Sequence, residues 1–250
     1  MRALDAIERG ARALGVLIVP SWRASQLEEE RHISRLLKFL DIDCVFDVGA
    51  NAGQHAKKLR RYCEYKGLIL SFEPNPACLP ALKKSASKDP LWHVFPFALG
   101  EEKGNAEFHA YDDSLLGSML KFNPAAAGAP EVMPYKSISV EVDTIANVFP
   151  QLQREFGFAR PFLKLDTQGS DLKAAKGAGE TIRQFLGIQS EVAFDPIYQG
   201  APKFEEVTGY YEAKGFRMSR LFANNDVHFP RLVEMDVALV RADQLKPSSR

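Results

Sequence analysis

Residues 44–59 read CVFDVGANAGQHAKKL, and this stretch decides the fold. The apolar run CVFDV predicts a buried strand, and the residues from 53 to 65 have the pattern of a helix. Gly49 and Gly53 lie between the two, where glycine permits a tight turn and a close approach of a ligand to the main chain. A helix start also offers free N–H groups and the positive end of a dipole. The stretch therefore predicts a strand, a turn and a helix of an α/β protein, with a candidate ligand site at the turn.

The alternation of strand and helix continues along the chain. Helices are expected at 24–40, 53–65, 77–87, 145–157, 170–185 and 203–216. Strands are expected at 44–48, 67–74, 91–100, 161–166, 187–194, 217–223 and 235–242. This order is typical of a mostly parallel sheet with helices on both faces. Ligands of such sheets bind beyond the carboxyl ends of the strands, so the loops after the strands should carry the site.

One region departs from the alternation. Residues 104–111 and 136–145 alternate like strands with no helix between them, and residues 120–135 form a loop rich in Pro, Ala and Gly. The pattern predicts a small β insertion around 104–142, with a loop that is well placed to act as a lid.

Charge and residue spacing argue against two kinds of ligand, nucleic acids and resident metal ions. The chain has 250 residues, of which 46% are hydrophobic, and its 32 basic and 32 acidic side chains cancel. A nucleic-acid partner is not expected, because such proteins usually carry a basic excess. The five histidines are spread out without metal-ligand spacing, so no resident metal site is expected, although an acceptor-activating Mg²⁺ on Asp166 stays an alternative.

Compartment and membrane contact follow from two further features. Cys44, Cys63 and Cys78 form no C-x-x-C pair, which favours free thiols in a reducing cytoplasm. No apolar run reaches the ~18–20 residues that span a bilayer. For residues 1–20, two interpretations remain: a packing segment, or a surface helix that associates weakly with a membrane.

The turn itself has three interpretations. It can need glycine for its geometry alone. A dinucleotide fingerprint, G-x-G-x-x-G, would require glycine where the chain has Asn51. The observed order D-x-G-x-N-x-G begins with Asp47, and an acid there favours a cationic, phosphate-free nucleoside such as S-adenosylmethionine. Glu73, at the end of the next expected strand, is either an acceptor for ribose hydroxyls or an exposed strand-end acid.

Five blocks then resemble a known family. FDVGANAGQHA, SFEPNP, FALG, VDTI and FLKLDTQGSDLKAAKGA occur in the order found in FkbM-type methyltransferases, a branch of the class I S-adenosylmethionine-dependent enzymes. The similarity covers residues 42–220. It implies a Rossmann-like fold with a seven-stranded sheet whose last strand is antiparallel. The domains expected from it are an N-terminal helical extension at 1–40 and a single methyltransferase catalytic domain at 41–243.

The resemblance also implies roles for the cofactor site. The turn residues Asp47, Gly49, Asn51 and Gly53 would surround the methionine part of the cofactor, with Glu73 on the ribose. Ala98 and Leu99 match the position that lines the adenine, and the nearest acids for its amino group are Glu101 and Glu102. The family pattern D-x-E-G becomes Asp166-Thr167-Gln168-Gly169 here, which weakens any role that needs an acid at 168.

Methyl transfer is a displacement at carbon, in which the protein aligns donor and acceptor and removes a proton from the acceptor. Asp166 ends a central strand and is the first candidate base; alternatively it is a helix cap or an ion-pair partner of Lys164 or Lys173. Glu191 is the second candidate. Gln168 can orient the acceptor but cannot take a proton.

The acceptor expected from these features is a small molecule or a saccharide. Methylation of a hydroxyl of a saccharide or secondary metabolite is the favoured activity. An NAD-type oxidoreductase and a non-catalytic cofactor-binding module remain alternatives. Four aromatic residues after the fifth expected strand form either a wall for a sugar or part of the core: Tyr198, Phe204, Tyr210 and Tyr211.

Overall fold

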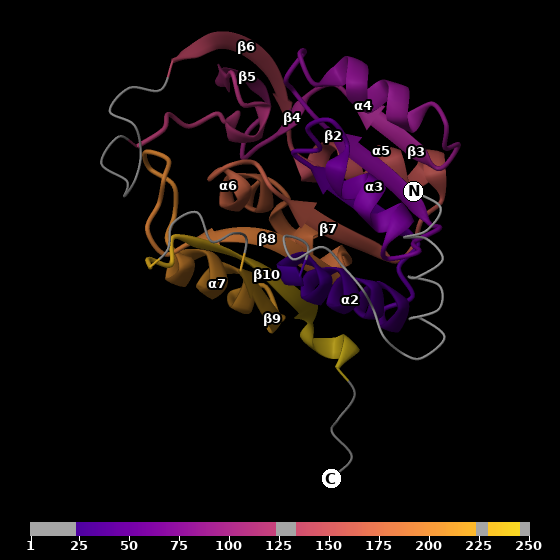
Figure 1. The fold of residues 1–250 in the computed structure, drawn as a ribbon. Helices are drawn as coiled ribbons and strands as arrows, with labels where there is room; N and C mark the ends of the chain where they lie inside the picture. Colours follow the sequence, from indigo (N-terminus) through magenta and orange to yellow (C-terminus); the bar gives the residue numbers. More distant parts are fainter. Residues whose placement is uncertain (1–23, 124–133, 224–229, 246–250) are drawn as a thin grey trace, which may run out of the picture.

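A computed structural model describes residues 24–123, 134–223 and 230–245. Seven strands form one sheet in the order β3-β2-β1-β7-β8-β10-β9 (Figure 1). Their bounds are β1 Cys44–Val48, β2 Leu68–Phe72, β3 Trp92–Phe95, β7 Pro161–Leu165, β8 Gly187–Ala193, β9 Phe216–Ala223 and β10 Glu234–Arg241. The first five in chain order pair in parallel, whereas β10 is antiparallel to both neighbours. The expected mostly parallel sheet with an antiparallel last strand is confirmed.

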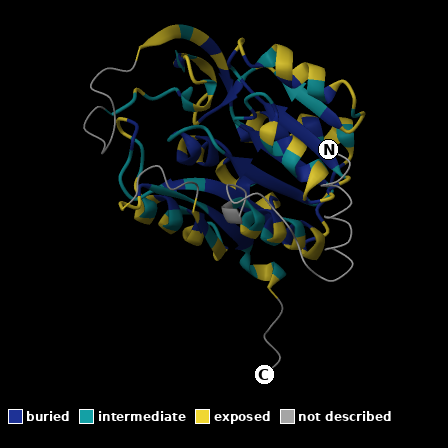
Figure 2. Cartoon of the chain, viewed as in Figure 1, coloured by how far each residue is buried: buried dark blue, intermediate teal, exposed yellow. Residues whose placement is uncertain are grey.

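Helices cover both faces of this sheet, also as expected. The helices α2 (Ala24–Phe39), α3 (Gln54–Arg61) and α4 (Leu79–Ala86) pack on one face. The helices α5 (Ile145–Phe156), α6 (Asp171–Lys176) and α7 (Phe204–Ala213) pack on the other. Alternate residues of a strand point to opposite faces of the sheet. Since helices cover both faces, every residue of the central strands β1 and β7 is buried, and these strands are dark blue in Figure 2.

Aromatic rings fill the core beneath α5. The ring of Phe46 lies 5.7 Å from the rings of Phe72 and Phe149 in stacked geometry. Phe158 and Phe185 meet the same ring edge-on at 5.5 and 5.2 Å. Such pairs add about 0.5–1.5 kcal/mol each beyond the burial of their area, so this cluster holds β1 and β2 firmly against α5.

A second, three-stranded sheet has the order β4-β6-β5, and it lies in the upper part of Figure 1. It consists of β4 (Ala98–Leu99), β5 (Gly104–Tyr111) and β6 (Tyr135–Asp143), with the short 3₁₀ helix η2 (Ser114–Leu116) after β5. The β insertion is therefore present. The lid expected at 120–135 falls mainly on residues 124–133, which lie outside the described residues, as does the segment 1–20.

Several expected elements differ in their extent: the helix expected at 53–65 ends at Arg61, and two others differ more. The strand expected at 91–100 is divided at Pro96, which has no N–H for a ladder, so β3 joins the large sheet and β4 the small one. The helix expected at 170–185 ends at Lys176 and is followed by the 3₁₀ helix η3 (Gly179–Gln184). Gly177 and Gly179 weaken the helix between them, and Gly179 has a φ of 55°.

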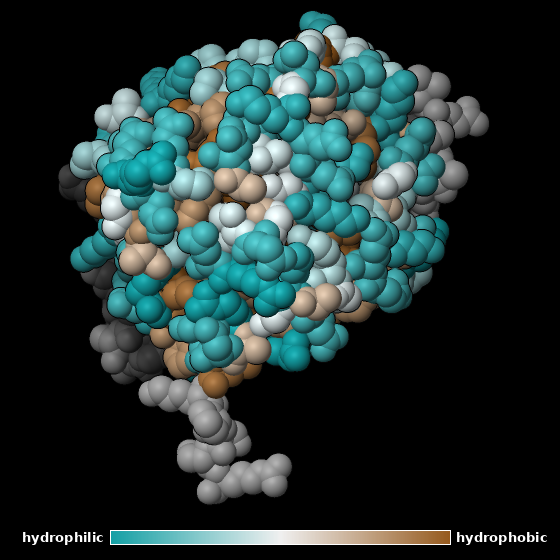
Figure 3. All heavy atoms as spheres, turned by 180° about the vertical axis from the view of Figure 1, so that it is seen from behind, coloured by the Kyte–Doolittle hydropathy of each residue, from teal (hydrophilic) through white to brown (hydrophobic). Residues whose placement is uncertain are grey.

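The outer surface is mixed in character. On the face seen in Figure 3, hydrophobic atoms reach the surface only in small separate areas between hydrophilic side chains. None of the helices in the described ranges combines the length and the apolarity that a membrane crossing requires.

Candidate active site

The glycine turn after β1 is packed tightly against the end of β7. Gly49 has a φ of 77°, and a Cβ there would lie 1.8 Å from the carbonyl oxygen of Asp166. Gly53 has a φ of 82°, and a Cβ there would lie 2.8 Å from the ring of Trp92. Both glycines are thus required by backbone geometry and by protein contacts, since the space that a side chain would fill is already occupied. The close packing sets the turn and Asp166 side by side.

Glu73 links the turn to the loop after β2. The backbone N–H of Asn51 donates to Glu73 Oε2, and that of Asn75 donates to Oε1, each at 2.7 Å. The side-chain amide of Asn51 also donates to the carbonyl oxygen of Ser114 at 2.7 Å, which ties the turn to the insertion. Glu73 is only 5% exposed. Burial raises the pKa of Glu73, and the N–H groups of Asn75 and Asn51 oppose that shift.

These contacts are compatible with a nucleoside at the turn. A carboxylate has about four lone-pair sites, and the backbone N–H groups take two of those on Glu73. The remaining two can accept the hydroxyls of a ribose. Glu73 is buried and accepts hydrogen bonds from the backbone N–H groups of Asn51 and Asn75. The alternative of an exposed strand-end acid is therefore wrong.

A row of polar side chains runs beneath the turn from β3 to β7. The indole N–H of Trp92 donates to Ser71 Oγ at 2.9 Å, and Ser71 Oγ–H donates to Asp47 Oδ2 at 3.0 Å. Asp47 Oδ1 lies 3.4 Å from Lys164 Nζ, which lies 3.3 Å from Asp166 Oδ2. The register explains the row, because Asp47 is paired with Ser71 on β2 and with Lys164 on β7.

Asp47 is fully buried in this row, with its side chain 0% exposed. Burial raises the pKa of Asp47, while the ammonium of Lys164 acts in the opposite direction. For Lys164, burial lowers the pKa, but the carboxylates of Asp166 and Asp47 outweigh it and raise the pKa above its ordinary value. Lys164 therefore carries a positive charge at this position. The contact of Asp47 with a cofactor remains a prediction.

The loop after β7 places Gln168 beside Asp166. Its Nε2 donates to Asp166 Oδ1 at 2.8 Å, and Tyr198 O–H donates to its Oε1 at 2.9 Å. Ser118 Oγ–H, from the segment after η2, donates to the carbonyl oxygen of Gln168 at 2.6 Å. Gln168 has a φ of 53°, a conformation that non-glycine residues rarely adopt. Such strain persists where surrounding contacts hold it, often at functional sites.

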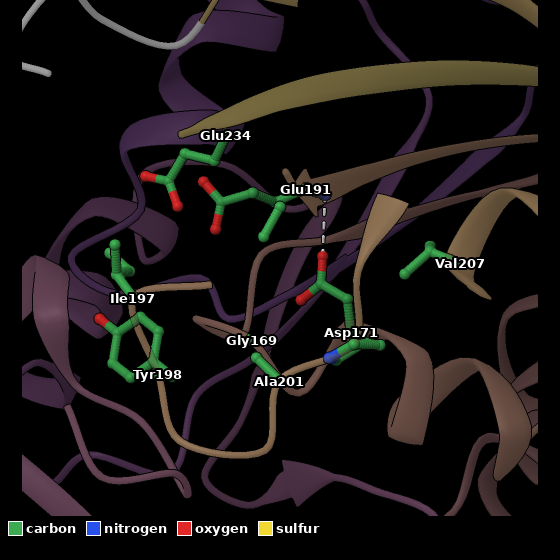
Figure 4. A pocket seen from close by; sticks show the side chains of 10 residues that line it. Gly169, Asp171, Glu191, Ile197, Tyr198, Ala201, Val207 and Glu234 are labelled. Atoms are coloured by element: carbon green, nitrogen blue, oxygen red, sulfur yellow. Dashed lines mark hydrogen bonds between the residues drawn. The ribbon is translucent and has the colours of Figure 1, made fainter. Parts of the chain in front are cut away.

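Asp171, a residue not predicted from the sequence, links this loop to β8. Its Oδ1 accepts bonds at 2.6 Å from the backbone N–H and from the hydroxyl of Thr167. Its Oδ2 accepts the backbone N–H of Glu191 at 2.9 Å, shown as a dashed line in Figure 4. An acid in the first turn of a helix was the available signal, and its partners on β8 became visible only in the fold.

A pocket opens beside this loop. Glu191 from β8 and Glu234 from β10 extend toward the same side of it, above Tyr198 (Figure 4). Its walls are formed by Gly169, Asp171, Glu191, Ala193, Ile197, Tyr198, Ala201, Pro202, Val207 and Glu234. Glu234 was missed in the sequence because it lies far along the chain and only the antiparallel pairing of β10 with β8 brings it to Glu191.

Burial raises the pKa of the acids in and beside this pocket. Burial, with the charges of Asp166 and Asp171, raises the pKa of Glu234 to about 7 from its ordinary 4.5. Burial, with the charges of Glu234 and Asp166, raises the pKa of Glu191 well above its ordinary value. Asp236, beside Glu191 on β10, is shifted in the same direction, chiefly by burial.

We expect Glu234→Gln to raise the melting temperature at pH 8 and to change it little at pH 5. The folded protein holds a proton on Glu234 that the unfolded chain loses near pH 4.5, so stability falls as the pH rises toward 7. Glutamine removes this loss, which amounts to about 1–3 kcal/mol. Thermal melts at both pH values, with the exposed Glu155→Gln as control, check it. An equal effect of Glu234→Gln at both pH values would contradict the assigned shift.

The other predicted residues lie elsewhere. Ala98 and Leu99 are buried in β4, paired with β6, so their contact with adenine stays a prediction. Glu101 and Glu102 are exposed in the turn that follows. His55 is half-buried, and its Nε2 has no hydrogen-bond partner among the described residues. Burial lowers the pKa of His55 well below its ordinary value, with the charges of Lys164 and Lys58 acting in the same direction.

The aromatic residues divide between core and pocket. Tyr211 is fully buried and Phe204 packs against the same core, as does Tyr210, so these three are largely structural. Tyr198 is 2% exposed and lines the pocket. In the described ranges, no group of three or more His, Cys, Asp or Glu side chains is arranged to hold a metal ion.

A family of known proteins matches most of this chain. A model of the methyltransferase FkbM domain matches residues 47–218. A crystal structure of methyltransferase FkbM from Methylobacillus flagellatus has a TM-score of 0.53 and 16% identity, over 79% of this chain and 44% of that one. This chain thus spans less than half of that relative. At this identity, the likeness establishes the shared fold alone.

More distant structures were also found. Magnesium protoporphyrin IX methyltransferase from Synechocystis, with bound S-adenosylmethionine, has a TM-score of 0.45 and 10% identity over 94% of this chain and 91% of that one. Fibrillarin from Aeropyrum pernix, in complex with the same molecule, has a TM-score of 0.43 and 12% identity, over 84% and 74%. No curated protein matches the chain significantly.

Proposed function

Since the chain belongs to the FkbM methyltransferase family, we propose that it transfers a methyl group from S-adenosylmethionine to a hydroxyl of a saccharide or secondary metabolite. One observation carries this proposal. The family match includes the glycine turn, Glu73 and Asp166, and these three lie together at the carboxyl ends of β1, β2 and β7. Parallel sheets bind their ligands at this edge.

In the proposed cofactor site, each group of residues would contact a different part of S-adenosylmethionine. The turn from Gly49 to Gly53 would lie along the methionine part, and Glu73 would accept the ribose hydroxyls. Ala98 and Leu99 would line the adenine. When bound, S-adenosylmethionine supplies a sulfonium-activated methyl group, which is already a strong electrophile. The chain then needs to align the acceptor and remove its proton.

We expect Glu73→Ala to weaken binding of S-adenosylhomocysteine by about 1–3 kcal/mol, because two ribose hydroxyls lose their acceptor. Calorimetry on the purified protein measures this change. The exposed Glu64→Ala, an acid of the α3–β2 loop, is the matched control. An affinity for Glu73→Ala within error of the wild type would remove Glu73 from the cofactor site.

The acceptor would bind in the pocket between the β7 loop and the ends of β8 and β10. Asp166 is the proposed base, because its side chain is 42% exposed and its two oxygens are oriented by Lys164 and Gln168. Glu191 would accept a hydrogen bond from a second hydroxyl of the acceptor. Burial raises the pKa of Glu191 well above its ordinary value, which makes Glu191 the second choice for the base.

The deciding experiment has two parts. Thermal shifts with S-adenosylhomocysteine and with NAD identify the cofactor, and a shift with NAD alone would support an oxidoreductase instead. Methyl transfer from radiolabelled S-adenosylmethionine to a panel of saccharides and hydroxylated metabolites then identifies the acceptor. Cofactor binding without transfer to any member of the panel would favour a non-catalytic binding module.

The proposed setting of the reaction is the cytoplasm. Cys44, Cys63 and Cys78 are all buried and unbridged, which agrees with a reducing compartment.

The described part of the proposed catalytic domain, within 41–243, contains both sheets, and α2 belongs to the proposed N-terminal extension.

A further inference from the structure

We propose that the outer side of α3 and α4 is a docking surface for an anionic phospholipid bilayer. Its exposed cations have no acid to pair with, and exposed apolar side chains lie at its edge. Binding there does not depend on the proposed methyl transfer. It also uses residues other than 1–20, the segment for which membrane contact was considered from the sequence.

Positive charge is concentrated in the part of the chain that contains α3 and α4. Residues 54–91 include eight basic and three acidic side chains, whereas the 32 basic and 32 acidic side chains of the whole chain cancel. Asp89 and Glu64 are each paired with a cation, and Glu73 is buried in the candidate active site. None of the three acids is therefore free to neutralise the remaining cations.

Two cations of this segment are used inside the protein. Lys58 pairs with Glu29 at 3.3 Å, and Arg60 pairs with Asp89 at 2.7 Å. The other cations are exposed and form no ion pair with a described residue. They are called the basic face here, and they are Lys57, Arg61, Lys66, Lys83, Lys84 and Lys88. Like charges without acids among them produce a positive potential that attracts an anionic surface.

The helices that carry the basic face lie side by side on one face of the large sheet (Figure 1). Arg60 bonds to Asp89 and, at 3.4 Å, to the carbonyl oxygen of Leu91, which ties α3 to the loop after α4. An ion pair joins α3 to α2 on its other side. Arg31 and Arg35, which are exposed on α2 and also lack an ion pair with a described residue, extend the basic face.

Exposed apolar side chains lie at the end of this layer that is remote from the candidate active site. Phe39 ends α2, Tyr62 follows α3 and Leu91 precedes β3, so all three lie at the amino ends of the parallel strands. They are 57%, 37% and 47% exposed, and the guanidinium of Arg61 lies 5.2 Å from the centre of the Tyr62 ring. Aromatic and aliphatic side chains beside lysine and arginine are typical of surfaces that rest among lipid headgroups.

A bilayer accounts for both features of this surface. Each Lys or Arg near an anionic leaflet raises the partition constant about fivefold, and the interface also accepts apolar side chains. The phosphates of a nucleic acid would attract the cations but would offer Phe39 and Leu91 no apolar phase to enter. Docking also leaves the candidate active site open, because that site lies at the carboxyl ends of the same strands.

Sedimentation of the full chain with lipid vesicles tests the proposal. Vesicles of phosphatidylcholine with about 30% phosphatidylserine should sediment the protein, pure phosphatidylcholine should not, and binding should weaken as the salt concentration rises. A triple variant carries Lys66→Gln, Lys84→Gln and Lys88→Gln. Its binding to the anionic vesicles should fall by more than about tenfold, because three charges near the surface are lost.

The matched control carries Lys136→Gln, Lys173→Gln and Lys203→Gln, which remove three exposed charges from β6, α6 and the start of α7. It should bind the anionic vesicles as the wild type does. A further variant, Tyr62→Ser with Leu91→Ser, removes apolar side chains without changing charge. Its binding should weaken by at least about fourfold, the effect of one buried CH₂ group.

Several results would overturn the docking surface. One is that the wild type fails to bind anionic vesicles, or binds neutral vesicles equally well. Another is wild-type binding by the Lys66 triple variant or by the Tyr62 variant, or an equal loss in the control. Every variant retains residues 1–20, so a contact made by that segment would persist in all of them. Binding of a single-stranded oligonucleotide without sedimentation on vesicles would identify a nucleic-acid surface instead. None of these measurements needs cofactor or acceptor, so they are independent of the proposed activity.

Discussion

Asp166→Asn is expected to slow methyl transfer by about 10²–10⁴-fold, the usual contribution of a positioned general base. Asparagine keeps the size of the side chain, and its amide oxygen can still accept a hydrogen bond from Lys164, but the amide cannot take a proton. Lys164 also retains Asp47 as a counter-ion, so the fold should tolerate the change. Turnover of radiolabelled cofactor with the best acceptor of the panel measures the effect.

Binding of S-adenosylhomocysteine should be unchanged in the same variant, because Asp166 is proposed to act on the acceptor. The matched control is Asp41→Asn, at the opposite end of β1, where the side chain is 93% exposed. Wild-type turnover in Asp166→Asn would move the role of base to Glu191. Loss of cofactor binding would instead show that Asp166 belongs to the cofactor site.

Gly49→Ala is expected to destabilise the protein by more than about 4 kcal/mol, a range reached only by severe core or backbone changes. Two costs combine. A left-handed residue other than glycine costs about 1–2 kcal/mol. In addition, the new Cβ would lie 1.8 Å from the carbonyl oxygen of Asp166, a backbone atom at the end of a buried strand that cannot easily move.

Gly157→Ala separates these two costs. Gly157 ends α5 with a φ of 70°, close to the 77° of Gly49, but a Cβ there meets nothing within 4 Å. Its cost should stay near the about 1–2 kcal/mol of the left-handed backbone alone. Urea denaturation of both variants measures the difference. Equal losses in the two would mean that the contact with Asp166 is relieved by a small shift of the turn.

Much of the fold followed from local pattern. The run CVFDV and the blocks near 68–72 and 161–165 are apolar throughout, as strands buried on both faces must be, and they became β1, β2 and β7. The errors also had local causes. Pro96, which has no N–H, divided one expected strand between two sheets, and Gly177 with Gly179 ended a helix early, because glycine weakens a helix.

The candidate site was predictable only in part. Glu73 and Asp166 could be chosen because each follows or ends an apolar strand, where a parallel sheet exposes its ligand edge, and Glu191 because it is an acid within such a strand. Glu234 could not be chosen, because its neighbourhood with Glu191 depends on β10 entering the sheet between β8 and β9. The role of Asp171 was hidden for the same reason, since one of its partners, the backbone N–H of Glu191, lies on β8.

Residues 44–59 show which features the sequence determined and which only the tertiary structure decided. By itself, the sequence determined that a strand, a glycine turn and a helix follow one another from Cys44, because backbone conformation and burial period are local properties. Only the tertiary structure decided that Gly49 is required by the carbonyl of Asp166, that Asp47 is a buried partner of Lys164, and that Gln168 donates to Asp166. These contacts depend on which strands lie side by side and in which register, and residues far apart in the chain carry no local mark of that pairing.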